Sequence, residues 1–157
     1  MAFPSRHRLH LPHRDGRTGS VCLTWRLHRA MQRLEPSERE VILGVIGRTP
    51  LTWCELVAVV VMDDHVHALL TLNGEKTAAQ VAQALKSISS HEIVQRGRRP
   101  PPIWQAEYFD RWMESGAQIE ACARYVLSNP RRRWPDLGSY RWVIDRSAHE
   151  GPGRLAP

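Results

Sequence analysis

The sequence predicts an α+β domain with a ferredoxin-like (RRM-like) βαββαβ antiparallel sheet and one additional C-terminal helix. Two observations predict this class. Segments with strand-like patterning alternate with segments of helical periodicity in the order β-α-β-β-α-β-α. The two central strands are separated only by Asp63-Asp64, as in an antiparallel hairpin. The length of 157 residues suits one such domain.

The first half of the pattern is strand, helix and strand. Residues 20–28 alternate apolar and polar side chains in part, which is typical of a strand. A helix is predicted from Pro36 to Gly47, because acidic residues follow the proline and an apolar stripe continues from them. Residues 51–62 become almost continuously apolar, as in a buried strand.

The second half repeats the order and adds the last helix. Residues 65–72 complete the hairpin, residues 77–91 have one apolar helical face, and residues 103–113 are an aromatic-rich strand. A third helix is expected over 118–129, ended by Pro130. In this layout we expect helices on one face of the sheet, with the other face left available.

Three regions are predicted along the chain. Residues 1–19 form a basic arm rich in Arg and His and broken by Pro and Gly, which includes Arg14. Residues 20–143 form the folded domain. Residues 144–157 lose the pattern after Trp142 and end in Gly and Pro, so we expect a disordered tail.

The composition points to a polyanionic partner. The formal net charge is +6 and the pI is about 9.9, with arginine carrying almost all of the positive charge. Replacement of Lys by Arg in a GC-rich genome explains the Arg/Lys ratio but not the net sign. Arginine forks suit phosphate oxygens and base edges. Nucleic acid is therefore the first partner to consider.

Cysteine usage and hydropathy indicate a reducing compartment. Cys22, Cys54 and Cys122 are odd in number and widely spaced, which supports neither a disulfide framework nor a zinc knuckle. The longest apolar run, Leu56–Met62, is too short to span a bilayer, and the basic N-terminal residues do not resemble a signal peptide. We expect a cytoplasmic, nucleoid-associated protein with no membrane contact.

A histidine pair opens the second strand of the hairpin. His65 and His67 are two residues apart, so an extended strand points both toward one face, where they can chelate one cation. The apolar set Val66, Ala68, Leu70 and Leu72 points to the other face and should meet the helices. The alternative is two partly exposed histidines beside a turn.

The last helix carries a phenol and an amide. Its apolar stripe is Ile119, Cys122, Ala123, Val126 and Leu127. Tyr125 and Asn129 lie off that stripe and share a face, four residues apart. An amide oxygen can ligate a hard metal ion, and a deprotonated phenol can attack phosphorus. The alternative is a half-buried aromatic ring and an ordinary helix C-terminal asparagine.

Arginine clusters flank these residues. Arg131, Arg132 and Arg133 begin two residues beyond Asn129, where bound phosphates would lie near Tyr125. A second set occupies the 95–102 loop, namely Arg96, Arg98 and Arg99, and the N-terminal arm is a third. The alternative for the first cluster is a solvated basic helix end, which suits the helix dipole.

Several segments resemble the IS200-like, single-tyrosine HUH transposases. They are Val60–Leu70, Ile103–Arg111 and Ala123–Pro130. Arg8–His13, Thr24–Leu27 and Tyr140–Trp142 resemble the branch associated with repetitive extragenic palindromes (REP). The segments occur in family order over residues 8–143, and four in order are more specific than any one alone.

The resemblance implies a mechanism. His65, His67 and Asn129 would bind Mg²⁺ or Mn²⁺, and Tyr125 would attack a phosphodiester in single-stranded DNA to leave a 5′-phosphotyrosine. Lys86 falls where the family often has a lysine, which implies a DNA contact. The implied partners are single-stranded DNA and DNA hairpins of imperfect palindromes, bound by a monomer or homodimer.

Two rival functions remain open, and the chain departs from the family pattern at one position. A DNA-binding regulator could keep the fold without catalysis. An RNA-binding module shares this sheet topology, but the central strands lack the aromatic RNP-type signature of such modules. The family usually has Pro or Asn before the first histidine, where this chain has Asp63-Asp64. Two carboxylates there could tune metal affinity or repel the DNA backbone.

Overall fold

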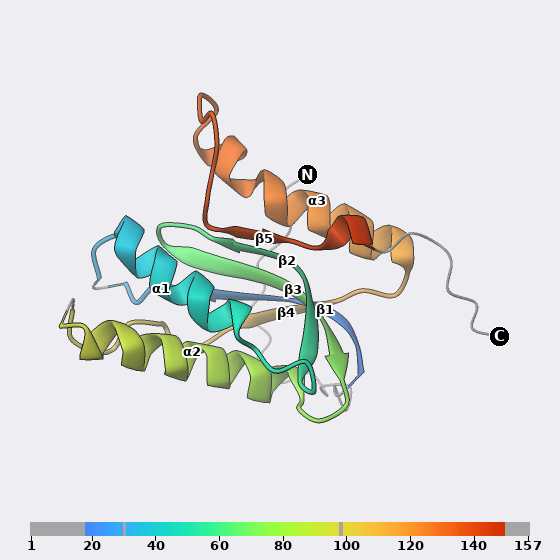
Figure 1. The fold of residues 1–157 in the computed structure, drawn as a ribbon, viewed down its shortest axis with the longest axis horizontal. Coiled ribbons are helices and arrows are strands. Elements are labelled where there is room, and N and C mark those ends of the chain that lie inside the picture. The colour runs from blue at the N-terminus through green and yellow to red at the C-terminus, as the bar shows by residue number, and fades with distance from the viewer. Residues whose placement is uncertain (1–17, 30, 98, 150–157) are drawn as a thin grey trace.

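A computed structural model describes residues 18–29, 31–97 and 99–149 (Figure 1). Predictions that fall on residues 1–17 of the N-terminal arm, with Arg14, on Arg98 and on residues 150–157 lie outside the described residues, whereas the last two residues of the predicted arm begin the first strand. The elements are β1 (Thr18–Arg26), α1 (Pro36–Gly47), β2 (Cys54–Val61), β3 (His65–Asn73), α2 (Ala78–Gln95), β4 (Phe109–Trp112), α3 (Gly116–Arg133), β5 (Val143–Asp145) and a 3-10 turn (Ser147–His149).

The strands form one five-stranded sheet in the order β4-β1-β3-β2-β5, and every pairing is antiparallel. The first four strands have the order expected of the split βαβ arrangement, so the predicted fold class is confirmed. β3 lies at the centre, between β1 and β2, and its first residues pair with the end of β1.

Helices cover both faces of the sheet (Figure 1). α1 and α2 pack on one face, where the alternate β3 residues Val66, Ala68 and Leu70 join the larger core, as their spacing predicts. α3 packs on the opposite face, where Leu69 of β3 meets Val126 in a second core. The sheet face that was expected to remain uncovered is therefore covered by α3, because the apolar stripe of this helix must be buried against another element.

Helix α3 continues through Pro130, which sequence analysis took as its end. Proline lacks the N–H that would bond to Val126 O one turn earlier. The side chain of Asn129 supplies a substitute donor, since its Nδ2 lies 3.3 Å from Val126 O. The helix then continues to Arg133, and Trp134 N donates to Pro130 O at 2.8 Å.

Two further boundaries differ from the predictions. The strand predicted over 103–113 is regular only at Phe109–Trp112, with one isolated bridge from Trp104 to Leu27. Between them, the carbonyls of Ala106 and Glu107 accept from Lys86 Nζ instead of from a neighbouring strand.

The predicted disordered tail begins with a strand instead. Val143–Asp145 forms β5 and pairs with Ala58–Val60 of β2. Three residues are too few for the two-residue period of a strand to be recognised in the sequence. Their extended conformation follows only from their pairing with the open edge of β2. Helix α2 also extends past the predicted His91 to Gln95.

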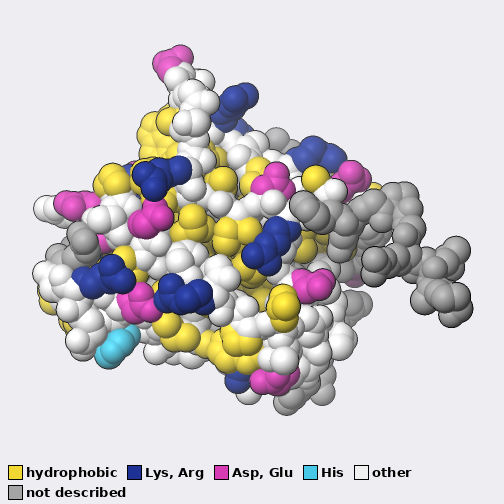
Figure 2. Space-filling model, in the orientation of Figure 1, with side chains coloured by type: hydrophobic (Ala, Val, Ile, Leu, Met, Phe, Trp, Pro, Cys, Tyr) yellow, Lys and Arg dark blue, Asp and Glu magenta, His cyan; other side chains and the backbone are white. Residues whose placement is uncertain are grey.

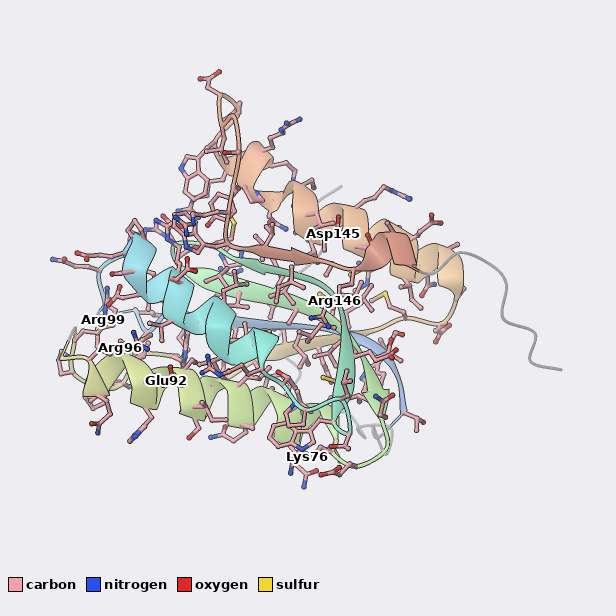
Figure 3. The ribbon with its side chains drawn as sticks, in the orientation of Figure 1. Lys76, Glu92, Arg96, Arg99, Asp145 and Arg146 are labelled. Atoms are coloured by element: carbon pink, nitrogen blue, oxygen red, sulfur yellow. The ribbon has the colours of Figure 1, made fainter. Side chains whose placement is uncertain are left out.

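A buried ion pair joins α1 to the 99–103 segment. Both oxygens of Glu38, which is 2% exposed, accept from Arg99 at 2.6 Å. Arg99 also donates to Gln32 O at 2.7 Å and Arg33 O at 3.1 Å. Figure 3 labels Arg99 at this junction, near the C-terminal end of α2.

Replacement of Arg99 by alanine is expected to destabilise the fold by about 3–5 kcal/mol, because the Glu38 carboxylate would stay buried without its partner. Urea unfolding measures the change. Arg96→Ala is the matched control: Arg96 forms only a solvent-exposed pair with Glu92 at 3.8 Å, so the expected loss is within about 0.5 kcal/mol. Equal losses in the two variants would contradict a structural role for Arg99.

Candidate active site

The histidine pair lies at the start of β3, under α3. His65 and His67 are 9% and 8% exposed, and their ring centroids are 4.7 Å apart with an interplanar angle of 80°. The strand alternation therefore brings the two rings together on one face, as the sequence predicts. Their position against a covering helix is unlike two surface histidines beside a turn.

Each ring is oriented by an oxygen atom at Nδ1. The Asp64 Oδ1 atom lies 2.6 Å from Nδ1 of His65, and the Thr24 Oγ1 atom lies 2.7 Å from Nδ1 of His67. Thr24 is directly opposite His67 in the β1–β3 register. With Nδ1 engaged on both rings, Nε2 is the nitrogen left to bind a ligand, which is the usual arrangement around metal-binding histidines.

The environment keeps His67 neutral. Burial lowers its pKa, and electrostatic interactions with His65, Arg26 and Arg132 lower it further, to about 3. A neutral imidazole is the form that ligates a metal ion. Two oriented ring nitrogens, one of them on a ring that resists protonation, thus fit a divalent cation.

Tyr125 approaches this pair from α3. Its ring centroid is 5.8 Å from that of His67, and the guanidinium carbon of Arg132 lies 4.1 Å from the centre of the tyrosine ring. The tyrosine is half-buried at the edge of the second core. Packing of α3 on the sheet therefore joins a phenol and an arginine of this helix to the histidine pair of β3, which lies far from them in the chain.

Asn129 is placed differently from the prediction. The sequence put it off the apolar stripe beside Tyr125, but it is 9% exposed and lies on the buried side of α3 with Val126. Its Nδ2 donates to Tyr125 O at 3.0 Å, and its Oδ1 accepts from Arg132 at 3.3 Å. The amide oxygen needed for a metal ligand is thus turned toward Arg132.

The described residues contain no group of three or more His, Cys, Asp or Glu side chains arranged to hold a metal ion. A metal ion at the histidine pair would therefore need its third protein ligand from another residue type. The amide oxygen of Asn129 fits that requirement chemically, once it exchanges Arg132 for the cation.

Asp63 and Asp64 are balanced by two arginines. Arg133 contacts both carboxylates at 3.1 Å, and Arg33 pairs closely with Asp64. Burial alone would raise the pKa of Asp64, but the hydrogen bond and charge of His65, with Arg133 and Arg33, hold it well below its usual range. Asp64 is therefore a carboxylate that orients His65, and its charge is compensated locally.

The described residues among those predicted to bind DNA have three different placements. Arg131, Arg132 and Arg133 lie at the C-terminal end of α3, beside Tyr125 and the acidic turn. Lys86 and Arg99 are instead engaged inside the fold, Lys86 by two backbone carbonyls and Arg99 by Glu38. Burial lowers the pKa of Lys86. Arg96 pairs with Glu92 on the surface of α2 (Figure 3).

Sequence analysis missed two residues that support the site. Thr24 orients His67, and Arg33 pairs with Asp64. The signal for Thr24 is the strand register, which no local pattern reveals. Arg33 lies between β1 and α1 in a segment without periodicity, so only the fold brings it to the acidic turn.

The comparisons with known proteins identify the family. The model of the IS200-like transposase family matches residues 25–129, and the chain belongs to this family. It is thus a member of a class of DNA transposases. No curated protein matches the sequence. None of the helices in the described part of the chain is long and apolar enough to cross a membrane.

Two solved structures share the fold. One is a REP-associated tyrosine transposase bound to a REP hairpin, with a TM-score of 0.59 and 19% identity over 85% of this chain and 75% of that one. The other is a candidate transposase from Deinococcus radiodurans R1, with a TM-score of 0.50 and 18% identity over 80% of this chain and 97% of that one.

The neutral state of His67 predicts an acid-sensitive fold. Its pKa is about 3 in the folded protein against 6.5 for the free side chain. Above pH 6.5 the side chain is therefore neutral in both states and does not make the stability depend on pH. Below that pH the unfolded chain binds a proton that the folded chain does not, and stability falls by up to about 1.4 kcal/mol per pH unit. His67→Gln is expected to remove this contribution.

Urea unfolding of both proteins between pH 7 and pH 4 measures the difference. The stability of His67→Gln should decline less steeply than that of the wild type below pH 6. Parallel curves over the whole range would contradict a buried, neutral His67.

Proposed function

We propose that this protein cleaves and rejoins single-stranded DNA beside a hairpin, with Tyr125 as the nucleophile and a divalent metal ion at His65 and His67. The observation that carries the proposal is the placement of the Tyr125 ring 5.8 Å from His67 and beneath Arg132. The match to the IS200-like transposase family over residues 25–129 supports DNA strand exchange as the biological setting.

His65, His67 and Asn129 would hold Mg²⁺ or Mn²⁺. When bound, the cation would polarise the scissile phosphate and neutralise charge that develops during attack. The protein supplies the orientation of the ligands: Asp64 holds one ring, Thr24 holds the other, and the helical backbone holds the Asn129 amide. Such supporting contacts are what give a metal site its affinity and geometry.

The tyrosine step conserves the phosphodiester bond energy. The Tyr125 oxygen, after losing its proton, would attack phosphorus and form a P–O bond, while the bond from phosphorus to the 3′ oxygen breaks and that oxygen leaves as a hydroxyl. Attack by a 3′-hydroxyl on the phosphotyrosine reverses these changes and rejoins the strand. Arg132, whose guanidinium lies over the ring, can hold the phosphate in line for this attack.

A DNA hairpin is the proposed recognition element. The support is the shared fold with the transposase whose structure contains a REP hairpin, together with the net charge of +6. The exposed arginines at the end of α3 would contact the single strand that leads to the nucleophile. A catalytically silent regulator would not need the two supporting hydrogen bonds on the histidine pair, so the enzyme is the better explanation.

Replacement of Tyr125 by phenylalanine is expected to abolish a covalent protein–DNA adduct, because only the hydroxyl is removed. Wild-type protein, Mn²⁺ and a labelled hairpin with single-stranded flanks should give an adduct that survives denaturing electrophoresis. Tyr108→Phe, at another half-buried tyrosine, is the control and should retain the adduct. Hairpin binding without an adduct in any condition would support the regulator instead.

Replacement of Asp64 by alanine is expected to weaken Mn²⁺ binding by about 10- to 100-fold, since His65 would lose its orienting carboxylate. Titration of Mn²⁺ followed by electron paramagnetic resonance measures the affinity without DNA or turnover. Asp145→Asn, at the exposed last residue of β5 (Figure 3), is the matched control for loss of one negative charge. An equal, small effect of both variants would exclude Asp64 as a supporting residue.

A further inference from the structure

The segment between α3 and β5 forms an open pocket that the proposed cleavage step does not use. Its volume is about 720 Å³, within the range of roughly 300–1,000 Å³ common for ligand sites. The residues that carry the argument are Arg39, Arg133, Trp134, Tyr140, Arg141 and Trp142. Figure 2 shows hydrophobic atoms beside Lys and Arg atoms at the base of this projecting segment.

Three aromatic rings form one side of the pocket. The rings of Trp134 and Tyr140 are stacked, with centroids 5.8 Å apart and an interplanar angle of 23°. Trp142 meets Tyr140 edge-on at 5.2 Å. All three side chains are only partly buried, so aromatic surface remains in contact with solvent. Such surface in a soluble protein is typical of a binding site.

Guanidinium groups surround these rings. The guanidinium carbon of Arg39 lies 4.0 Å from the centre of the Trp142 ring, and that of Arg133 lies 5.4 Å from the centre of the Trp134 ring. Arg141 also approaches Trp142, at 5.9 Å. Among the described residues, the lining includes these three arginines and one carboxylate, Asp136. Arg133 also pairs with Asp63 and Asp64, and Arg141 pairs with Glu40, whereas Arg39 donates to the neutral Tyr140 hydroxyl. The pocket therefore combines π faces with guanidinium groups.

The pocket is anchored to the end of β2. The Tyr140 hydroxyl donates to Val61 O at 2.6 Å, and Val61 N donates to Trp142 O at 3.0 Å. Arg39 in turn donates to the Tyr140 hydroxyl at 3.2 Å. These contacts fix the rings relative to the sheet, so ligand binding does not require the pocket to be built first.

Arg133 links the pocket to the histidine pair. It lines the pocket and also contacts Asp64, whose carboxylate holds His65. A single DNA strand with one phosphate near Tyr125 could pass Arg133 and place a neighbouring nucleotide at the aromatic rings. Position and charge therefore match a nucleotide of the same DNA strand.

We propose that this pocket binds one unpaired base of the single-stranded DNA flank, stacked on the Trp134–Tyr140 face, with its phosphate held by the surrounding arginines. Aromatic rings with cationic neighbours are the usual way in which proteins bind unpaired bases. An apolar peptide would gain nothing from three guanidinium groups. The proposal rests on the proposed function, since it assumes that single-stranded DNA is the substrate.

The test combines Trp134→Leu with a set of hairpin oligonucleotides that carry one abasic site at each flank position in turn. Fluorescence anisotropy measures the affinity of wild type and variant for every oligonucleotide. At one flank position, loss of the base should weaken wild-type binding by about 5- to 150-fold. The same abasic oligonucleotide should bind Trp134→Leu no more weakly than the intact one does.

Three controls make the result specific. Trp134→Tyr keeps an aromatic face and should bind within a few-fold of wild type, which separates stacking from loss of fold. Trp53→Leu is the matched variant, because Trp53 is also half-buried under a cation, Lys76, but lies at the start of β2. It should keep wild-type affinity. A hairpin without flanks should bind wild type and Trp134→Leu equally.

The proposal is overturned if every abasic position weakens wild type and Trp134→Leu by the same factor, or if Trp53→Leu reproduces the loss. This failure differs from failure of the proposed function. If the Tyr125 adduct forms on the flank while Trp134→Leu binds the flanked hairpin as tightly as wild type does, the cleavage mechanism stands and the pocket does not bind a base. If no adduct forms and no single strand binds, the proposed function itself fails.

Discussion

The packing of α3 across β2 and β3 is the interaction on which the site depends. Val126 and its neighbours bury their apolar stripe against Leu69, and this contact covers the face of β3 that carries His65 and His67. The same contact brings the Tyr125 ring to His67. A helix that packed elsewhere would leave two histidines exposed on a bare sheet and a tyrosine without a partner. Apolar packing of ordinary residues therefore places the reactive groups, and their own contacts only adjust them.

Burial of polar groups in this region is stabilised by a chain of specific partners. Thr24 and Asp64 satisfy the histidine rings, Asn129 compensates for the missing N–H of Pro130, and Arg133 balances the acidic turn. A buried polar group without such partners would cost free energy. The fold itself thus holds the polar groups of the candidate site in place, which the proposed function requires for electrostatic stabilisation of a transition state.

The arginine excess serves two different purposes. Arg99 closes a buried pair with Glu38 and holds the backbone at Arg33, whose own side chain reaches Asp64. Arg132 and Arg133 stand instead at the end of α3, between the tyrosine, the acidic turn and the aromatic pocket. Net charge indicated a polyanion as the first partner to consider but said nothing about this division, because composition does not distinguish a buried guanidinium from an exposed one.

By itself the sequence determined the element order, the common face of His65 and His67 and the helical spacing of Tyr125, because these follow from periods of 2 and 3.6 residues. The ferredoxin-like class followed from that order. Only the tertiary structure decided that α3 covers the second face, that Asn129 turns inward, that the helix continues through Pro130, and that residues 143–145 extend the sheet. The covering of the second face and the added strand depend on partners distant in the chain, namely an apolar sheet face and a strand edge. The passage through Pro130 depends on the hydrogen bond from Asn129 Nδ2 to Val126 O, which the helical period does not specify. Local sequence patterns do not indicate which distant residues will be in contact. For this reason the histidine pair was predicted from the sequence, and its supporting residues Thr24 and Arg33 were not.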